Sequence, residues 1–309
     1  MHYLAFDVSK KKLDGVVTNL RTKEEHFRIE NTEDAVGAFL EAAPLPKKIL
    51  AGCEATGGYH LALAKACLAR GLAFRVLNPV LTKQFTKATV RKKKTDLTDA
   101  VIVAKLLAQG EGRPFSWDPV VEGAKREYRA DRLVSRYATG LLLARHADPG
   151  NAYLRDALGE LQRLRKAEAK RVRDAYAANE EVALIQSVRG VGFRSAFAIW
   201  SEIGDVRRFS SAKQLVAYAG LDPRIRQSGH TLNSQGRLTK RGSPHLRHAL
   251  FMAATCARMH DPELKAYYGK KRAEGKKHTV AVCATARKLI HRIYAVWNRR
   301  TPYVPAATA

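Results

Sequence analysis

Four acidic residues in the first hundred positions have the types and spacing that metal-assisted phosphoryl transfer requires. Asp7 and Glu54 each end an apolar run, and Asp96 and Asp99 lie three residues apart, so that on a helix their carboxylates share one face. Carboxylates that converge on one point repel each other unless a cation lies between them, and Mg²⁺ accepts carboxylates, waters and phosphate oxygens as ligands. Two such ions, about 3.5–4 Å apart, stabilise the attacking and leaving oxygens of a phosphoryl transfer.

Each acid also has a simpler explanation. Asp96 stands where a helix begins and could cap it, and Asp7 could be a surface acid at the end of a strand. Taken together on this pattern of strands and helices, the four favour a shared site. We therefore predict that Asp7, Glu54, Asp96 and Asp99 are metal ligands and catalytic residues.

Ser228 is the candidate nucleophile of the C-terminal half. It precedes Gly229 in a polar segment, and the chain has no acidic residue between Asp222 and Asp261. Basic neighbours would stabilise a serine alkoxide and the phosphorane that follows its attack on a phosphodiester. A lone Ser-Gly pair is usually only a turn. Ser243 is the rival, but Pro244 after it suggests a helix cap with proline in the first helical position.

Glycines and basic residues mark the candidate contacts with nucleic acid. Gly190 and Gly192 have the form of a helix-hairpin-helix turn, whose backbone N–H groups can point at a phosphate, although an ordinary tight helix connection has the same pattern. The predicted nucleic-acid-binding residues are Lys92, Lys93, Lys94, Gly190, Gly192, Arg224, Arg226, Lys240 and Arg241. His230, His245 and His248 form a loose cluster, for which phosphate contact or packing is favoured over metal binding.

The charge balance indicates a polyanionic partner. The 309 residues include 55 Lys and Arg but 29 Asp and Glu, a formal net charge of +26. Such an excess opposes compaction unless a polyanion neutralises it, and nucleic acid is the usual one. A membrane surface is disfavoured because the basic residues do not gather on one amphipathic helix. With neither a long apolar run nor a signal segment, we expect a cytoplasmic protein, and the four widely spaced cysteines suggest reduced thiols rather than zinc or disulfides.

The elements that must position these residues follow from hydrophobic periodicity. Residues 2–8, 13–19 and 24–29 read as an antiparallel meander, and a helix follows near residue 31. Strands at 48–54 and 73–77 alternate with helices, the first of them at 59–70. This β-β-β-α-β-α-β-α order is typical of a mixed α/β domain of the ribonuclease-H type.

The remainder of the chain is mainly helical. Residues 111–119 look like a linker, and 121–180 has a long helical pattern interrupted at 148–151. A leucine stripe there favours a solvated helical hairpin or short coiled coil, with dimerisation as an alternative; its members are Leu154, Leu158 and Leu161. Further helices are expected at 194–203, 211–219, 244–259 and 278–297. We predict three domains, 1–118, 119–183 and 184–309.

Several of these segments resemble one known family. FDVSKKKLD, CEATGGYH, VLNP and KKTDLTDA, in this order, resemble the N-terminal half of the DEDD insertion-sequence transposases, relatives of the Piv DNA invertase that include the RNA-guided bridge recombinases. The family's Asp-Glu-Asp-Asp set matches Asp7, Glu54, Asp96 and Asp99. The stretch QLVAYAGLDPRIRQSG resembles its second conserved domain, whose catalytic serine matches Ser228.

The resemblance implies a RuvC-like domain, a helical spacer and a mainly α-helical C-terminal domain. It implies cleavage and rejoining of DNA strands through a covalent phosphoserine, with Mg²⁺ held by the four acids. It also implies a homo-oligomer, a dimer or tetramer, whose composite site takes the acids from one subunit and the serine from another. A structured guide RNA that pairs with donor and target DNA is a further implication; the charge suits RNA, but DNA alone would satisfy it.

Two other classes of function stay open on the sequence. In a metal-only RuvC-like nuclease, such as a junction resolvase, Ser228 would be structural. In a non-catalytic nucleic-acid-binding protein, only the glycine turn and the basic loops would be used. A covalent protein–DNA link separates the recombinase from the first alternative, and the four acids would be unexplained in the second.

Overall fold

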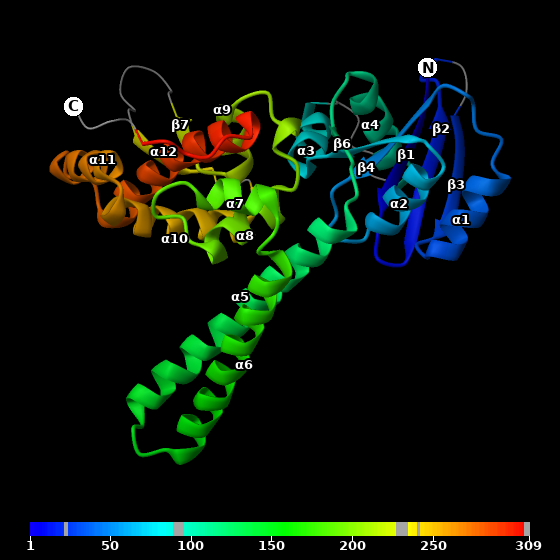
Figure 1. The fold of residues 1–309 in the computed structure, drawn as a ribbon. Coiled ribbons are helices and arrows are strands. Elements are labelled where there is room, and N and C mark those ends of the chain that lie inside the picture. Colours follow the sequence, from blue (N-terminus) through cyan, green and yellow to red (C-terminus); the bar gives the residue numbers. More distant parts are fainter. Residues whose placement is uncertain (22–23, 89–95, 227–233, 240–241, 306–309) are drawn as a thin grey trace. The chain divides into compact units, whose positions relative to one another are not determined.

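The structure is a computed structural model that describes residues 1–21, 24–88, 96–226, 234–239 and 242–305. The chain divides into two compact units, Met1–Trp117 and Asp118–Ala309 (Figure 1). The helices of the predicted spacer are grouped with the second unit. The three-domain division stays a prediction.

The first unit is built on a six-stranded mixed sheet. The strand order is β3-β2-β1-β4-β5-β6, in which β1, β2 and β3 are antiparallel, β4 and β5 run parallel to β1, and β6 is antiparallel to β5. This arrangement confirms the predicted ribonuclease-H-type α/β domain. The strands are β1 (His2–Val8), β2 (Lys12–Thr18), β3 (Glu24–Glu30), β4 (Ile49–Glu54), β5 (Ala73–Leu77) and β6 (Arg113–Pro114).

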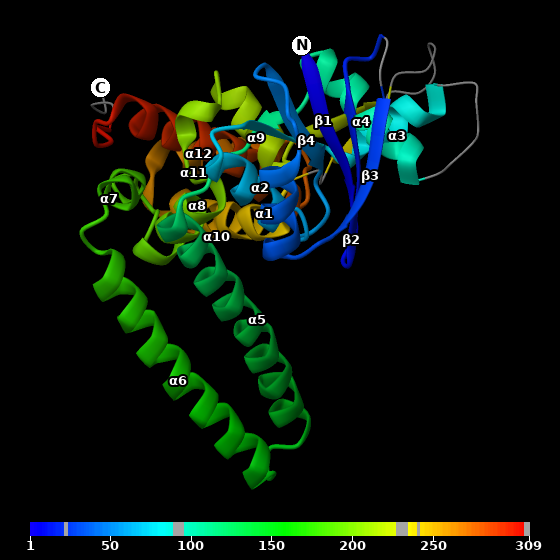
Figure 2. The ribbon, with the colours of Figure 1, turned by 90° about the vertical axis from the view of Figure 1, so that its right-hand side faces the viewer.

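Helices cover both faces of this sheet, so its central strands are apolar on both sides. The four helices are α1 (Glu33–Ala42), α2 (Leu61–Ala69), α3 (Pro79–Ala88) and α4 (Asp96–Ala108). On one face, Leu4 and Phe6 of β1 pack with residues of α1 and α2. On the other face, Ala5 and Leu50 pack with α4. Figure 2 shows α1 and α2 together beside the strands.

Gly52 of β4 lets α4 approach the sheet. A Cβ at this position would lie 2.6 Å from the carbonyl oxygen of Arg75 and 2.9 Å from the Leu107 side chain. We expect Gly52→Ala to lower the free energy of unfolding by about 1–3 kcal/mol, the usual cost of an overpacked core. Gly37→Ala in α1 is the control, because nothing lies within 4 Å of its Cβ. Urea denaturation of both variants should separate them, since alanine in a helix interior stabilises by about 0.5–1 kcal/mol; equal losses would contradict the packing argument.

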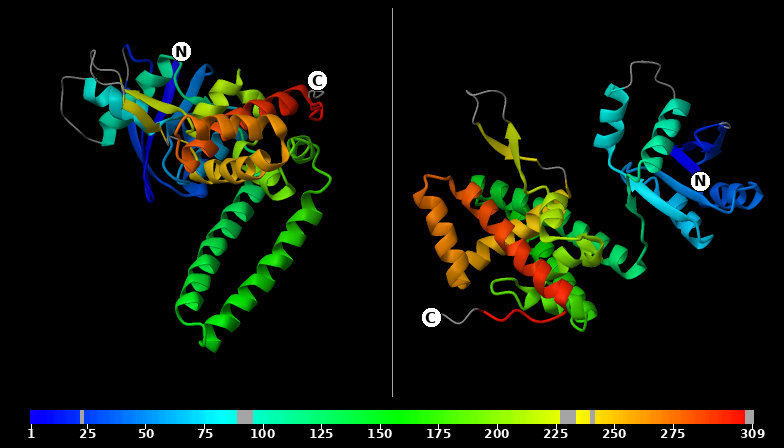
Figure 3. Two further views of the ribbon diagram at one scale, coloured as in Figure 1. Left: turned by 90° about the vertical axis from the view of Figure 1, so that its left-hand side faces the viewer. Right: turned by 90° about the horizontal axis from the view of Figure 1, so that it is seen from above.

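Over its described residues, the second unit is helical apart from two paired antiparallel strands. Its helices are α5 (Pro119–Ala147), α6 (Ala152–Tyr176), α7 (Glu180–Gln186), α8 (Phe193–Ile203), the short 3-10 helix η1 (Val206–Arg208), α9 (Ala212–Ala219), α10 (Pro244–His260), α11 (Pro262–Ala273) and α12 (His278–Arg299). The strands are β7 (Pro223–Arg226) and β8 (Ser234–Leu238), which project from the helices in the right-hand view of Figure 3. Within the part of the chain that is described, no helix is long and apolar enough to cross a membrane.

The predicted helical hairpin is confirmed as α5 and α6, which lie side by side in Figures 1 and 2. Asp118 caps α5 by accepting hydrogen bonds from Val120 and Val121, and Asn151 caps α6 at the predicted interruption. Leu158 of the leucine stripe is buried, whereas most of α6 is exposed and charged. The hairpin is therefore well solvated along much of its length.

Four elements lie where the sequence analysis predicted neither a helix nor a strand. Residues 113–114, inside the predicted linker, form β6 at the edge of the sheet, and β7 and β8 lie in the stretch read as glycine- and base-rich. Helix α11 also went unpredicted; it begins directly after Asp261, which caps it, with Pro262 in its first turn. Cys53 and Cys67 are buried free cysteines, and Cys256 and Cys283 are half-buried ones.

Candidate active site and nucleic-acid interface

Asp7 and Glu54 come together at the ends of two parallel strands. Phe6 of β1 pairs with Cys53 of β4, and the two acids are the next residue on each strand. Because parallel strands in register point matching side chains to the same face, both carboxylates lie on the face that α4 covers. Neighbouring Ala5 and Leu50 belong to the cluster on that face.

The environment of this pair is partly polar. Thr82 of α3 is buried and donates a hydrogen bond of 2.6 Å to Oε2 of Glu54. Cys53 precedes Glu54 on β4, and its side chain is buried in the cluster on the opposite face; burial chiefly, and then the charges of Cys67, Glu54 and Asp7, raise the pKa of its thiol. The charges of Asp7 on β1 and Glu54 on β4 thus both raise the pKa of the same buried thiol. This arrangement concentrates negative charge at the C-terminal ends of the two central strands.

Helix α4 carries the other two predicted acids. It starts at Asp96, and it packs on the sheet through residues such as Ala100 and Val103. Asp99 is half-buried in its first turns; the side chain of Asp96 lies outside the described part. Among the described residues, no three His, Cys, Asp or Glu side chains form a group arranged to hold a metal ion. Convergence of all four acids therefore stays a prediction.

Asp14 is an acid that the sequence reading did not single out. It pairs directly with Asp7 across β1 and β2, so it points to the same face, and it is only 2% exposed. Its carboxylate is neutralised by Arg28 at 2.6 Å and Lys12 at 3.4 Å. The signal was present in the segment FDVSKKKLD, where two acids flank a basic turn. Its partners make Asp14 a structural neighbour of the site.

The glycine turn joins α7 to α8, and its two glycines have different reasons to be there. Gly190 has φ +80°, and a Cβ on it would lie 2.3 Å from Cα of Ala257 in α10. Close packing of backbone on backbone thus requires glycine at this position. Gly192 is exposed, caps α8 without a side chain, and has open space around it. Only Gly192 leaves room for a phosphate at the helix N-terminus; its binding role stays a prediction.

Several predicted residues lie outside the described part of the chain. Ser228 and His230 belong to this group, as do Lys92, Lys93, Lys94, Lys240 and Arg241. Arg224 and Arg226 are on β7, and only their backbone is described. The structure therefore leaves the assigned roles of these residues as predictions.

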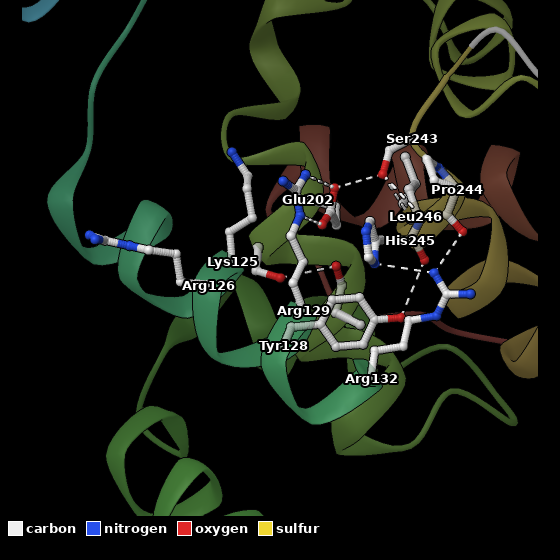
Figure 4. A network of polar contacts seen from close by, with 12 residues as sticks. Lys125, Arg126, Tyr128, Arg129, Arg132, Glu202, Ser243, Pro244, His245 and Leu246 are labelled. Atoms are coloured by element: carbon white, nitrogen blue, oxygen red, sulfur yellow. Dashed lines mark hydrogen bonds and ion pairs between the residues drawn. The ribbon is translucent and has the colours of Figure 1, made fainter. Parts of the chain in front are cut away.

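Ser243, the rival serine, is fully engaged in structure. Its Oγ accepts hydrogen bonds from the N–H groups of His245 and Leu246 at 3.2 and 3.3 Å, which makes it the N-cap of α10. The same hydroxyl donates to Oε2 of Glu202 at 2.8 Å (Figure 4). Pro244 occupies the first turn, so the interpretation of Ser243 as a helix cap is confirmed.

Glu202 is the buried centre of this network, which links α5, α8 and α10. Its side chain is 1% exposed and takes two hydrogen bonds from Arg129, at 2.7 and 3.0 Å (Figure 4). Burial alone would raise the pKa of Glu202, but the hydrogen bonds and charge of Arg129, with the Ser243 hydroxyl, lower it below its ordinary value. Glu202 is therefore an ionised carboxylate that holds the start of α10 in place.

Comparison with protein families decides the identity of the chain. Residues 4–137, which include the four predicted acids, match the DEDD transposase model of the IS110 type, described as "Transposase". Residues 182–269, which include the glycine turn and Ser228, match the "Transposase IS116/IS110/IS902 family". The chain belongs to the IS110 family of transposases. The predicted family is thus confirmed in both halves, and the chain is an enzyme of the class that recombines DNA.

Individual relatives are consistent with membership of the IS110 family. The pilin gene-inverting protein of Moraxella bovis is 26% identical over 263 residues, which cover 81% of this chain and 80% of that protein. The transposase for insertion sequence element IS1111A of Coxiella burnetii is 31% identical over 151 residues, 48% of this chain and 39% of that protein. Among solved structures, T. thermophilus RuvC in complex with a Holliday junction substrate aligns with 37% of this chain and 99% of its own, at 15% identity and a TM-score of 0.28.

Proposed function

We propose that this IS110-family transposase cleaves and rejoins the DNA strands of an insertion sequence, with Ser228 as nucleophile and Asp7, Glu54, Asp96 and Asp99 as metal ligands. The observation that supports it most directly is the adjacency of Asp7 and Glu54 on one face at the ends of β1 and β4. The family match supports the same chemistry in outline.

The donor set fits a divalent cation. Asp7 and Glu54 offer carboxylate oxygens, the ligands that Mg²⁺ prefers, and their mutual repulsion favours a cation between them. Mg²⁺, when bound, would polarise the scissile phosphate and stabilise its developing charge. The Thr82 hydroxyl donates a hydrogen bond to one oxygen of Glu54 and would hold this carboxylate in place for a bound ion.

In the proposed reaction, the oxygen of Ser228 forms a bond to phosphorus and gives up its proton. The bond from phosphorus to one sugar oxygen breaks, and that oxygen leaves as a hydroxyl. A free hydroxyl from another strand later displaces the serine, which restores a phosphodiester and rejoins the DNA. Because both steps exchange one phosphate ester for another, the energy of the DNA backbone is retained in the enzyme link.

The proposal includes two kinds of partner besides donor and target DNA. A structured guide RNA is what the family resemblance implies; the net charge of +26 suits an RNA, and DNA alone would satisfy it as well. A homo-oligomer would supply acids and serine to one site from different subunits. Sequencing the nucleic acid that co-purifies with the chain tests the first, and light scattering in the presence of DNA tests the second.

The experiment that tests the function traps the covalent intermediate. Labelled DNA carrying the element's ends is incubated with protein and the co-purified nucleic acid, then separated on a denaturing gel. We expect a protein–DNA adduct that Ser228→Ala abolishes, because alanine has no nucleophile. Ser243→Ala should still form the adduct, with stability lower by about 1 kcal/mol for the lost cap.

Two outcomes contradict this assignment. Cleavage at the normal rate without any adduct would favour a metal-only nuclease. An adduct that persists in Ser228→Ala but disappears in Ser243→Ala would move the nucleophile to the helix cap.

A further inference from the structure

Cationic side chains crowd one region of the second unit, where α5 lies against α6, α8 and α10. Asp131 of α5 is shared by two arginines, Arg194 of α8 and Arg165 of α6, the latter 3.6 Å away. Ser135, one turn further along α5, accepts hydrogen bonds from the same two guanidinium groups. A single carboxylate therefore serves two full positive charges.

Arg132, the next residue on α5, adds a third positive charge. Its Nη1 lies 3.2 Å from the carbonyl oxygen of Pro244 and 3.1 Å from Nδ1 of His245, both in the first turn of α10 (Figure 4). Neither partner is negatively charged. Within the described ranges, no carboxylate lies at ion-pair distance from Arg132, so its charge is held by dipoles alone.

Two histidines of α10 complete the cluster. His245 is half-buried; it faces Glu202 of α8 and Arg129 and Arg132 of α5, and burial is the chief cause that lowers the pKa of its imidazole. His248 is exposed and lies one turn later; burial, then Arg132, Arg194 and His245, lower its pKa. Burial chiefly, and the nearby arginines after it, thus disfavour the charged form of both rings, while Glu202 partly opposes this at His245.

Positively charged side chains repel one another when few carboxylates lie beside them, and a bound anion relieves this repulsion. We propose that Arg132, His245 and His248 bind a phosphodiester group of a nucleic-acid backbone, with Arg194 at the edge of the site. Arginine suits this ligand because its planar guanidinium can offer two parallel N–H groups to phosphate oxygens. The inference rests on the proposed function only in that the ligand is a nucleic acid, and the site lies wholly within the second unit.

Binding at this site is linked to protonation. A phosphate next to His245 and His248 favours their charged forms, so the bound complex takes up protons that the free protein does not hold. Affinity must therefore rise as the pH falls through the range where histidines titrate. Arg132 supplies the part of the affinity that does not depend on the histidines.

The first test measures the salt dependence of binding by fluorescence anisotropy. The probes are a duplex DNA and a single-stranded RNA, each of about 20 nucleotides per strand, long enough to fill a site of several phosphates. Arg132→Gln should reduce the slope of log K against log salt by about 1 and weaken binding about five-fold, because one phosphate contact is lost. Arg145→Gln, which removes an exposed arginine in the last turn of the same helix, is the matched control.

The second test uses pH. Wild-type protein should bind about ten-fold more tightly at pH 5.5 than at pH 7.5, roughly the span over which histidine titrates. His245→Gln/His248→Gln should lose most of that gain, because glutamine cannot take up the proton that binding favours. His260→Gln, at the exposed end of α10, is the control. Should the double variant fail to fold, His248→Gln alone removes an exposed ring and should lose part of the gain.

The outcomes separate this site from the proposed chemistry. If the variants bind only the duplex DNA more weakly than the wild type does, the occupant of the site is a DNA backbone. If they bind only the RNA more weakly, the occupant is RNA. Equal slopes and equal pH dependence for all variants and controls, on both probes, would overturn the site. Ser228→Ala must bind both probes like the wild type, so a failure of catalysis cannot imitate a failure of this site.

Discussion

Asp7→Asn should lower the rate of DNA strand cleavage by about 1,000-fold, equivalent to about 4 kcal/mol of transition-state stabilisation. Asparagine has the same shape as aspartate but no charge. It would therefore weaken the binding of the divalent ion that the proposed mechanism requires. Glu54→Gln should have a similar effect, because glutamine can still accept the hydrogen bond from Thr82 while losing its charge. Single-turnover cleavage of labelled DNA with saturating protein measures the loss.

A second measurement separates this effect from misfolding. Asp7 lies beside Glu54 on the neighbouring parallel strand, so removing its charge also removes the repulsion between these two carboxylates. We therefore expect the melting temperature of Asp7→Asn not to fall, and nucleic-acid affinity to stay near that of the wild type. Asp34→Asn, an exposed acid in the first turn of α1, should cleave normally. Cleavage by Asp7→Asn within ten-fold of the wild type would rule out the metal-site assignment.

Arg129→Met should lower the free energy of unfolding of the second unit by about 3 kcal/mol, at the lower end of the cost of breaking a buried ion pair. The lower end applies because the Arg129 side chain is 45% exposed, whereas Glu202 is 1% exposed and would stay behind as a buried charge. Denaturant unfolding followed by tryptophan fluorescence is a suitable measurement, since Trp200 and Trp297 are both buried in this unit. Arg126→Met, on the exposed surface of α5, should change stability by less than about 0.5 kcal/mol.

The pH dependence gives this prediction its sharpest form. In the wild type the pKa of Glu202 is lowered on folding. Its ionised form therefore stabilises the fold above the ordinary carboxyl pKa, and this stabilisation is lost as the pH falls through the pKa of the folded state. Without Arg129, burial dominates and raises the pKa of Glu202, so the carboxylate destabilises the fold at neutral pH. The difference between variant and wild type should therefore shrink as the pH is lowered from 7 toward about 4. A difference independent of pH would mean that Arg129 stabilises by packing alone.

The sequence alone determined the layout of the first unit well. Strand β1 was placed at its observed bounds, because its apolar residues alternate between two buried faces and its neighbours have clear turn residues. The ends of α8, α9 and α10 lay within one residue of prediction, since caps such as Ser211 and Ser243 are local signals. The family resemblance also came from short motifs, and both family models confirm it.

The tertiary structure alone decided which residues far apart in the chain pair or pack with one another. The pairing of Asp14 with Asp7, and its neutralisation by Arg28, depends on the register of three strands and cannot be read from composition. Position 190 requires glycine because its backbone packs against Ala257, sixty-seven residues later, whether or not the turn also binds a phosphate. Strand β6 is two residues long and forms only because β5 offers an edge to pair with. Local sequence fixes caps and periodicity, whereas long-range packing selects which charged groups share a site, because that choice is set by burial and distance in the folded chain.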